Sequence, residues 1–285
     1  MGGDCKSPGS AFEGSNPSPA TSNTLHNDWK KMALSLVGSK VLITGATSGI
    51  GRETAKLLAQ SGCVVAVTGR RQERLEELEL EIKSFGGKVF SFCGDLVDPI
   101  TVRTIVAGAA DQLNGIDICI NNAGLLLTGP FKDAPSEEFD RMLDINLRGF
   151  IHVAHAVTPH LIESARSNKN GISDLVNVAS AAGRRAVKNS AVYNATKWGA
   201  IGFSDTLRME LASDSVRVGL IEPGSVNTEI QNQIRPEIRA IPRPEFSGYN
   251  KLESIDIAEA ITFMVTRERR AAVSEMLVRP SAQLT

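Results

Sequence analysis

Tyr193 and Lys197 are the two residues whose types and spacing best suit proton transfer. On a helix, residues i and i+4 lie on one face about one turn apart, so the phenol and the ammonium would point the same way. A nearby positive charge favours the phenolate, which makes such a tyrosine a proton donor near neutral pH. Ser180 lies upstream, and its hydroxyl could hydrogen-bond the oxygen that receives the proton. The same spacing is common among solvated helix residues, so the other segments must decide between the two interpretations.

A glycine-rich segment lies where a dinucleotide site would need it. It follows the apolar run 40–44 and precedes a stretch in which apolar residues have helical spacing. Glycines permit a tight turn and a close approach to a pyrophosphate, while the helix N-terminus adds free N–H groups. An ordinary glycine-rich connection is the alternative. The residues that would contact a cofactor here are Gly45, Thr47, Ser48, Gly49, Ile50 and Gly51.

The end of the second expected strand distinguishes NAD from NADP. An acidic residue there would hydrogen-bond the 2′-hydroxyl of the adenosine ribose in NAD. This chain has Arg70 and Arg71 after Gly69 instead. Guanidinium groups suit a 2′-phosphate through planar, charge-assisted contacts, so the pair favours NADP(H). If the two arginines merely begin a charged helix, the choice of cofactor stays open.

Short apolar runs alternate with longer stretches of helical periodicity. We expect strands at 40–44, 63–68, 88–93, 117–120, 175–179, 216–221 and 275–278. Helices lie between them, including a long one over 136–164 that Pro159 bends or interrupts. This order predicts an α/β fold: a single doubly wound Rossmann-type domain with a parallel sheet of about seven strands and helices on both faces. Ligands of such sheets bind beyond the carboxyl ends of the strands, where the glycine-rich and polar segments also fall.

The composition excludes several classes of function. The 31 basic and 32 acidic residues are well mixed and leave a net charge of -1, which argues against a nucleic-acid or membrane surface. The chain has no apolar run near the roughly 20 residues that span a bilayer and no secretion signal, so we expect a cytoplasmic protein. The four cysteines form no Cys-x-x-Cys pair, and the four histidines have no ligand cluster. We therefore expect free thiols in a reducing compartment and no metal site.

Residues 1–31 differ from the rest of the chain. They are rich in Gly, Ser, Pro and Asn and have no apolar periodicity, which predicts a disordered tail. Translation from Met32 is a further hypothesis, and in either case one domain covers 32–285.

A second distinct segment, 225–253, is irregular and is expected to form a lid over the substrate. Arg235, Arg239 and Arg243 recur along it, and Arg184 and Arg185 follow Ser180. These arginines could bind a substrate carboxylate, or they could form a solvated cationic surface.

Taken together, the segments resemble the short-chain dehydrogenase/reductase (SDR) family from about Lys40 to the C-terminus. Each piece is weak alone, but all occur in the family's order: Thr44-Gly45-x-x-x-Gly49-x-Gly51, Asn121-Asn122-Ala123-Gly124, Asn146, Ser180, Tyr193-x-x-x-Lys197 and Pro223-Gly224. The segments 68–75 and 221–224 also look like NADP-dependent 3-hydroxy acid (serine) dehydrogenases. The segment 183–193 looks like clavulanate-dehydrogenase-like members.

The resemblance implies a role for each matching residue. Tyr193 would be the general acid/base, Lys197 would stabilise the phenolate and bind the nicotinamide ribose, and Ser180 would stabilise the oxyanion. Asn146 would kink its helix and hold a water beside the lysine. The remaining implied cofactor contacts are Asp95 and Leu96 at the adenine, Asn122, Ala123 and Gly124 beside the sheet, and Pro223, Gly224, Val226 and Thr228 at the nicotinamide carboxamide.

The implied function is an NADP(H)-dependent oxidoreductase that transfers a hydride between the nicotinamide and a secondary alcohol or carbonyl compound. Its expected partners are this small molecule and other copies of the chain, in a homo-oligomer that is a tetramer or a dimer. A catalytically silent dinucleotide-sensing protein is the alternative, and an NAD-linked dehydratase or epimerase is disfavoured by Arg70 and Arg71. The sequence does not choose among a hydroxy acid, a keto acid and a neutral ketone or aldehyde.

Overall fold

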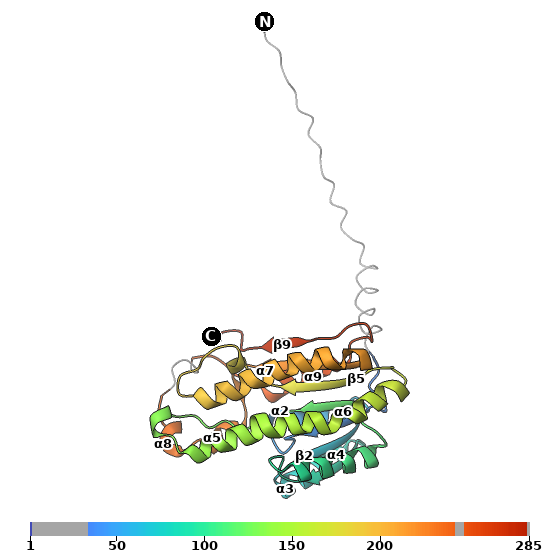
Figure 1. Cartoon of the computed structure of the whole chain (residues 1–285), viewed down its shortest axis with the longest axis horizontal. Helices are drawn as coiled ribbons and strands as arrows, with labels where there is room; N and C mark the ends of the chain where they lie inside the picture. Colours follow the sequence, from blue (N-terminus) through green and yellow to red (C-terminus); the bar gives the residue numbers. More distant parts are fainter. Residues whose placement is uncertain (2–33, 243–247, 284–285) are drawn as a thin grey trace. The chain divides into compact units, whose positions relative to one another are not determined.

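The computed structural model describes Met1, residues 34–242 and residues 248–283. Apart from Met1, the tail expected at 1–31 and the alternative start at Met32 lie outside the described residues, as do lid residues 243–247. The described part of the expected domain holds a central sheet, drawn as arrows in Figure 1.

The sheet has seven strands in the order β3-β2-β1-β4-β5-β6-β9, and every neighbouring pair is parallel. The prediction of a parallel sheet of this size is therefore confirmed. Its strands are β1 (Lys40–Thr44), β2 (Val64–Gly69), β3 (Lys88–Cys93), β4 (Ile118–Asn121), β5 (Ser173–Val178), β6 (Val216–Pro223) and β9 (Glu275–Val278).

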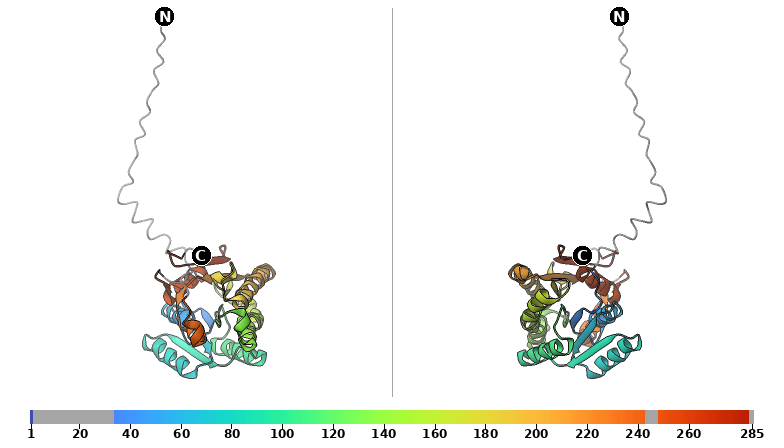
Figure 2. Two further views of the ribbon diagram at one scale, coloured as in Figure 1. Left: turned by 90° about the vertical axis from the view of Figure 1, so that its left-hand side faces the viewer. Right: turned by 90° about the vertical axis from the view of Figure 1, so that its right-hand side faces the viewer.

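Helices cover both faces of the sheet, as the two end views of Figure 2 show. One face packs against α2 (Gly49–Gln60), α3 (Gln72–Ser84) and α9 (Ser254–Val265). The other face packs against α4 (Pro99–Leu113), α6 (Phe150–Ser167) and α7 (Ala191–Leu211).

Strand β1 shows why the strands are apolar along their whole length. Val41 and Ile43 belong to the core beneath α2, α3 and α9, whereas Leu42 belongs to the core beneath α4, α6 and α7. Successive side chains of a strand point to opposite faces, and here both faces are covered. A continuous apolar run is therefore the pattern that this central strand requires.

The long helix expected over 136–164 is wrong in detail. The structure has α5 (Ser136–Leu143), a π-helical segment at Asp144–Gly149, and then α6. Pro159 lies inside α6 and does not end it. The interruption falls instead at the π-helical turn, where Gly149 lets the backbone approach closely, since a Cβ there would lie 2.6 Å from the carbonyl oxygen of Leu96.

The lid segment is less irregular than expected. Its described part contains β7 (Val226–Asn227), a 3-10 turn at Glu229–Gln233, the single helical turn α8 (Pro236–Arg239) and β8 (Leu252–Glu253). β7 and β8 pair in parallel as a separate two-stranded sheet. These short elements are held by neighbouring parts of the fold, because none of them buries an apolar face large enough to stand alone.

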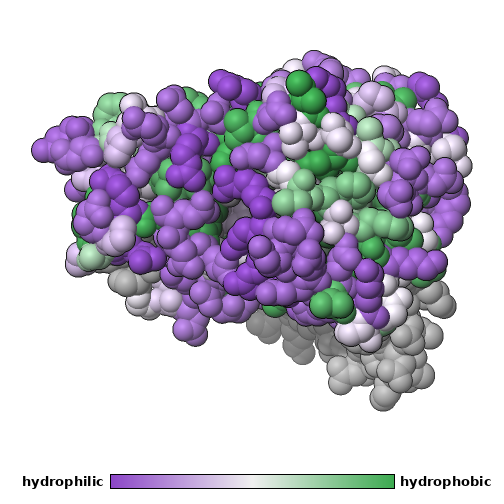
Figure 3. All heavy atoms as spheres, turned by 90° about the horizontal axis from the view of Figure 1, so that it is seen from below, coloured by the Kyte–Doolittle hydropathy of each residue, from purple (hydrophilic) through white to green (hydrophobic). Residues whose placement is uncertain are grey.

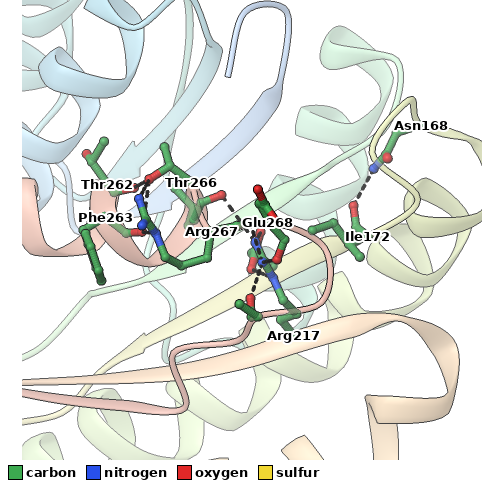
Figure 4. A network of polar contacts seen from close by, with 11 residues as sticks. Asn168, Ile172, Arg217, Thr262, Phe263, Thr266, Arg267 and Glu268 are labelled. Carbon is green, nitrogen blue, oxygen red and sulfur yellow. Dashed lines mark hydrogen bonds and ion pairs between the residues drawn. The ribbon is translucent and has the colours of Figure 1, made fainter. Parts of the chain in front are cut away.

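Arg217 in β6 ties the sheet to the turn that follows α9. Its guanidinium donates two hydrogen bonds of 2.8 Å to the carboxylate of Asp174 in β5. Its Nη1 also donates to the carbonyl oxygens of Arg267 and Glu268 (Figure 4). A further hydrogen bond joins Nη1 to the carbonyl oxygen of Ala271. Burial raises the pKa of Asp174, and the guanidinium opposes that rise. The contact fixes the path of the chain into the edge strand β9.

The surface agrees with the mixed charge of the sequence. The face shown in Figure 3 is mostly hydrophilic, with hydrophobic side chains in separate groups and a hollow near its centre. Among the described helices, none combines the length and apolar character needed to cross a membrane. Residues 34–242 and 248–283 contain no cluster of three or more His, Cys, Asp or Glu side chains suited to a metal ion.

Candidate active site

A cleft of about 880 Å³ opens beyond the carboxyl ends of the sheet strands. It lies where the order of the strands reverses between β1 and β4, which is the usual ligand site of such sheets. All of the predicted site residues line it except Gly51 and Asn146, which lie directly behind its wall. The fold therefore brings segments that are far apart in the sequence to one place.

The glycine-rich turn requires glycine at three positions. Gly45 and Gly49 have φ angles of +68° and +55°, a region that other residues rarely adopt. A Cβ on Gly51 would lie 2.5 Å from the carbonyl oxygen of Gly45. Ser48 precedes α2 without a hydrogen bond from its side chain to the first turn, so that turn keeps free N–H groups for a ligand. The turn thus fits the pyrophosphate of a dinucleotide.

Thr44 and Asn122 join the glycine-rich turn to the end of β4. The Asn122 side chain donates to the carbonyl oxygens of Thr44 and Gly45, at 2.9 and 3.3 Å. The Thr44 hydroxyl accepts the backbone N–H groups of Asn122 and Ala123. Asn122 is therefore a structural bridge at the floor of the cleft, where Ala123 and Gly124 also lie.

Arg71 lies across the dinucleotide end of the cleft. Its guanidinium donates to the hydroxyls of Thr47 and Ser48, at 2.8 and 2.9 Å from Nη2. Its Nη1 pairs with the carboxylate of Glu229, in the lid, at 2.9 Å. The neighbouring Arg70 lies 3.7 Å from Asp95. Both arginines are therefore at the cleft, and each already faces one carboxylate.

Asn146 supports the wall of the cleft from behind. It is 1% exposed and exchanges two hydrogen bonds with the backbone of Leu125, at 2.7 and 2.8 Å. Its amide also donates to the hydroxyl of Thr196. A π-helical turn spans Asn146 where a kink was expected, and the side chain holds the segment that contains Gly124 and Leu125.

Tyr193 and Lys197 lie on the inner face of α7. Their side chains are 9% and 5% exposed, and the Lys197 Nζ lies 5.8 Å from the centre of the phenol ring. Burial raises the pKa of Tyr193, and a hydrogen bond with Ser180 opposes that rise. Burial lowers the pKa of Lys197 to about 8. The expectation that the ammonium makes the phenol more acidic is not met here, because loss of solvent dominates and the ammonium donates to the Val178 carbonyl at 3.1 Å.

The loop after β6 closes the cleft opposite α7. Gly224 donates its N–H to the carbonyl oxygen of Val278, and a Cβ on it would lie 2.5 Å from Oε1 of Gln283. Thr228 begins the following 3-10 turn by accepting the N–H of Ile230. Pro223, Gly224, Val226 and Thr228 all line the cleft, as expected.

The arginines proposed for a substrate carboxylate separate into two groups. Arg184 pairs with the carboxylates of Glu222 and Glu275, and Arg235 pairs with Glu138 and Glu237. Arg185 and Arg239 line the cleft. Arg243 lies outside the described residues.

Sequence reasoning missed three contributors to the site, namely Thr196, Glu229 and Leu125. Thr196 lies between Tyr193 and Lys197, and its hydroxyl donates a hydrogen bond to the Tyr193 carbonyl oxygen. Glu229 reaches Arg71 across 158 positions of sequence. A single sequence holds no signal for such a distant pair, whereas Thr196 could have been suspected from its place between Tyr193 and Lys197.

A sequence profile of the short chain dehydrogenase family matches residues 39–239, more than half of the chain. The chain belongs to the short-chain dehydrogenase/reductase family. This SDR is also 33% identical over 245 residues to an uncharacterised oxidoreductase of Staphylococcus aureus strain USA300, covering 86% of this chain and 98% of that protein. It is an oxidoreductase by family.

Solved structures of other proteins are similar to this chain as well. A closed form of serine dehydrogenase in complex with NADP+ superposes with a TM-score of 0.78 at 31% identity, over 86% of this chain and 97% of that one. A 3-ketoacyl-(acyl-carrier-protein) reductase from Brucella melitensis, in complex with NADH, gives a TM-score of 0.77 at 29% identity, over 88% of this SDR and 100% of the reductase. The family and the fold predicted from the sequence are thus confirmed.

Proposed function

We propose that this SDR is an NADP(H)-dependent oxidoreductase that interconverts a carbonyl compound and a secondary alcohol. The observation that carries the proposal is the burial of Tyr193 and Lys197 together in the cleft whose far end is the glycine-rich turn. The bound nicotinamide supplies or accepts the hydride. The chain itself supplies orientation, a proton and a charged group in a site shielded from water.

Tyr193 is the acid/base in this mechanism. In the direction of reduction, its phenol gives a proton to the substrate oxygen, and the hydrogen bond with Ser180 holds the hydroxyl beside that oxygen. Lys197 faces the phenol ring, and its ammonium stabilises the negative charge left on Tyr193 after the transfer. Asn146 acts through the wall of the cleft, by fixing Leu125.

The preference for NADP(H) over NAD(H) is proposed from the end of β2. Arg70 and Arg71 follow that strand, and no acidic side chain takes their place. The fork of Arg71 points at the hydroxyls of Thr47 and Ser48 in the glycine-rich turn, which adds neutral donors beside the guanidinium. Planar guanidinium groups suit a phosphate, and the serine dehydrogenase relative is itself an NADP+ complex.

The substitution Tyr193→Phe tests the assignment of the acid/base. We expect turnover of carbonyl compounds with NADPH to fall by about 10²- to 10⁴-fold, because a positioned acid contributes that much. NADPH binding, measured by nucleotide fluorescence, should stay within about twofold, since the ring that packs in the wall is retained.

Near-normal turnover by Tyr193→Phe would contradict the assignment of Tyr193 as the acid/base. NADPH binding without turnover by the unaltered protein, across a broad panel of aldehydes, ketones and oxo acids, would favour a dinucleotide-sensing protein instead. Tighter binding of NADH than of NADPH would contradict the proposed cofactor preference alone.

A further inference from the structure

Charge is unevenly distributed along the cleft. Its acidic lining residues, Asp95 and Glu229, both face arginines at the dinucleotide end. Toward the substrate end the lining includes the cations Arg185, Arg239 and Lys251, and none of these forms an ion pair within the described part of the chain. A cleft lined by one sign of charge concentrates ligands of the opposite sign.

A hydrogen bond from α7 holds the backbone of Arg185 in place. The carbonyl oxygen of Arg185 accepts a hydrogen bond of 2.5 Å from the Asn194 side chain, in the first turn of α7, next to Tyr193. Asn194 also donates to the Ala182 carbonyl, just after Ser180. The backbone of Arg185 is thus fastened to the same two elements that carry Tyr193 and Ser180, whereas Arg239 is exposed at the end of α8.

No carboxylate among residues 34–242 and 248–283 forms an ion pair with the Arg185 guanidinium. Its Nε is buried without a hydrogen-bond partner, and the same is true of Nε of Arg279, which follows β9. Burial and the nearby charge of Arg279 lower the pKa of Arg185, while the Tyr249 phenol opposes them. Tyr249 itself hydrogen-bonds Ser225, in the loop after β6. Arg185 and Arg279 repel each other, and an anion bound in the cleft beside Arg185 would offset this repulsion.

The neighbouring Arg184 shows what an arginine looks like here when its role is structural. Its Nε donates to Glu222 at 2.7 Å, and its Nη2 contacts Glu275 at 2.5 Å, so it joins β6 to the edge strand β9. Arg185, one residue later, receives no such carboxylate from the described residues. The difference separates two arginines that the sequence left equivalent.

We propose that Arg185 binds a carboxylate of the substrate, so that the enzyme acts on hydroxy acids and oxo acids rather than on neutral alcohols and ketones. The proposal rests on the oxidoreductase function above and names its substrate class. A guanidinium presents two parallel N–H donors to a carboxylate, which fixes orientation as well as charge. Held at Arg185, the acid would place its carbonyl or hydroxyl group toward Ser180 and Tyr193.

The test compares acids with their own methyl esters. We expect acetoacetate and levulinate to have higher kcat/KM values than methyl acetoacetate and methyl levulinate. In Arg185→Gln, kcat/KM for the acids should fall about 10- to 100-fold, the loss of a charged pair of hydrogen bonds. The values for the esters should change by less than about threefold, and Arg185→Lys should restore part of the loss because it keeps the charge without the fork.

Two further variants identify the residue responsible. Lys188→Gln removes one exposed positive charge from the same loop, outside the cleft. It should leave unchanged the ratio of kcat/KM for the acids to kcat/KM for their esters. Arg239→Gln removes one of the two lid cations that line the cleft, the other being Lys251. If the ratio changes in Arg239→Gln and stays constant in Arg185→Gln, or if the unaltered enzyme prefers the esters, the proposal is overturned.

A binding measurement keeps this test separate from the proposed function. Titration calorimetry of butyrate into the protein loaded with NADP+ should show tighter binding than butyramide, and Arg185→Gln should abolish the difference. If no carbonyl compound is turned over but butyrate still needs Arg185, the oxidoreductase mechanism fails and the anion site stands. If both acids and esters are turned over and butyrate ignores Arg185, the mechanism stands and the anion site fails.

Discussion

Arg71 and Arg185 stand at opposite ends of one cleft, and they differ in what surrounds them. Arg71 follows β2, donates to the hydroxyls of the glycine-rich turn and already faces the carboxylate of Glu229. Arg185 precedes α7, has a cation for a neighbour and meets no carboxylate among the residues described. The comparison teaches that the partners an arginine already has, as well as its position in a motif, decide how readily it binds a further anion.

The two ends also differ in how they are held. At the dinucleotide end, glycines and backbone contacts leave no room for an added side chain. At the substrate end, a short 3-10 turn and a single helical turn carry the lid. We therefore expect steric changes to dominate at the first end and electrostatic changes at the second.

Gly51→Ala should have the largest effect, because it tests the steric end directly. The new Cβ would lie 2.5 Å from the Gly45 carbonyl oxygen and from the Asn122 amide, neither of which is a flexible chain end. We expect NADPH binding to weaken more than about 100-fold and the free energy of unfolding to drop by about 1–3 kcal/mol, as in other overpacked sites.

Gly202→Ala is the matched control, since a Cβ there meets no atom within 4 Å in helix α7. It should stabilise the fold by about 0.5–1 kcal/mol, because alanine has the higher helix propensity. Chemical denaturation and calorimetric NADPH titration measure both variants. Normal NADPH binding in Gly51→Ala would show that the turn is less rigid than its contacts indicate.

The pH dependence of carbonyl reduction should be of intermediate size. Lys197 has a pKa lowered to about 8 by burial, so its ammonium is present below that pH and lost above it. Tyr193 must be protonated to act as the acid, and its raised pKa keeps it so over this range. We expect kcat/KM for NADPH, which reports on the free enzyme, to be level below pH 8 and to fall about tenfold per unit above it.

Lys197→Arg tests the origin of this decline. Whatever activity it retains should persist to higher pH, because a guanidinium stays charged. An unchanged decline in the variant would assign the titration to another group.

Glu229→Gln should have the smallest effect and bears most directly on the two arginines. Removing the carboxylate frees Arg71 for a 2′-phosphate, so we expect NADPH and 2′,5′-ADP to bind about two- to fivefold more tightly, the range of an exposed ion pair. NADH affinity should not change. Glu77→Gln, which removes a carboxylate from Arg74 only, is the control.

Looser binding of NADPH by Glu229→Gln would mean that the lid carboxylate positions Arg71 for the cofactor. In that case the carboxylate beside Arg71 would support anion binding, and the contrast between Arg71 and Arg185 would be smaller than their surroundings indicate.

Much of the fold was predictable because both periodicities in the sequence are strong. The strands were placed within one or two residues, since apolar runs buried on both faces leave little ambiguity. The long helix over 136–164 could not be divided correctly, because a π-helical turn depends on what packs against it. There the Leu96 carbonyl approaches Gly149, and Asn146 is drawn to the Leu125 backbone.

The sequence by itself determined the family and the parallel sheet, and it predicted the pairing of Tyr193 with Lys197, because each depends on residue types at fixed local spacing. Tertiary structure alone decided that burial raises the pKa of Tyr193, that Glu229 faces Arg71, and that Arg184 is paired while Arg185 is not. These properties depend on solvent exclusion and on charges brought together from distant positions. Neighbouring residues such as Arg184 and Arg185 can therefore have equivalent sequence signals and different physical roles.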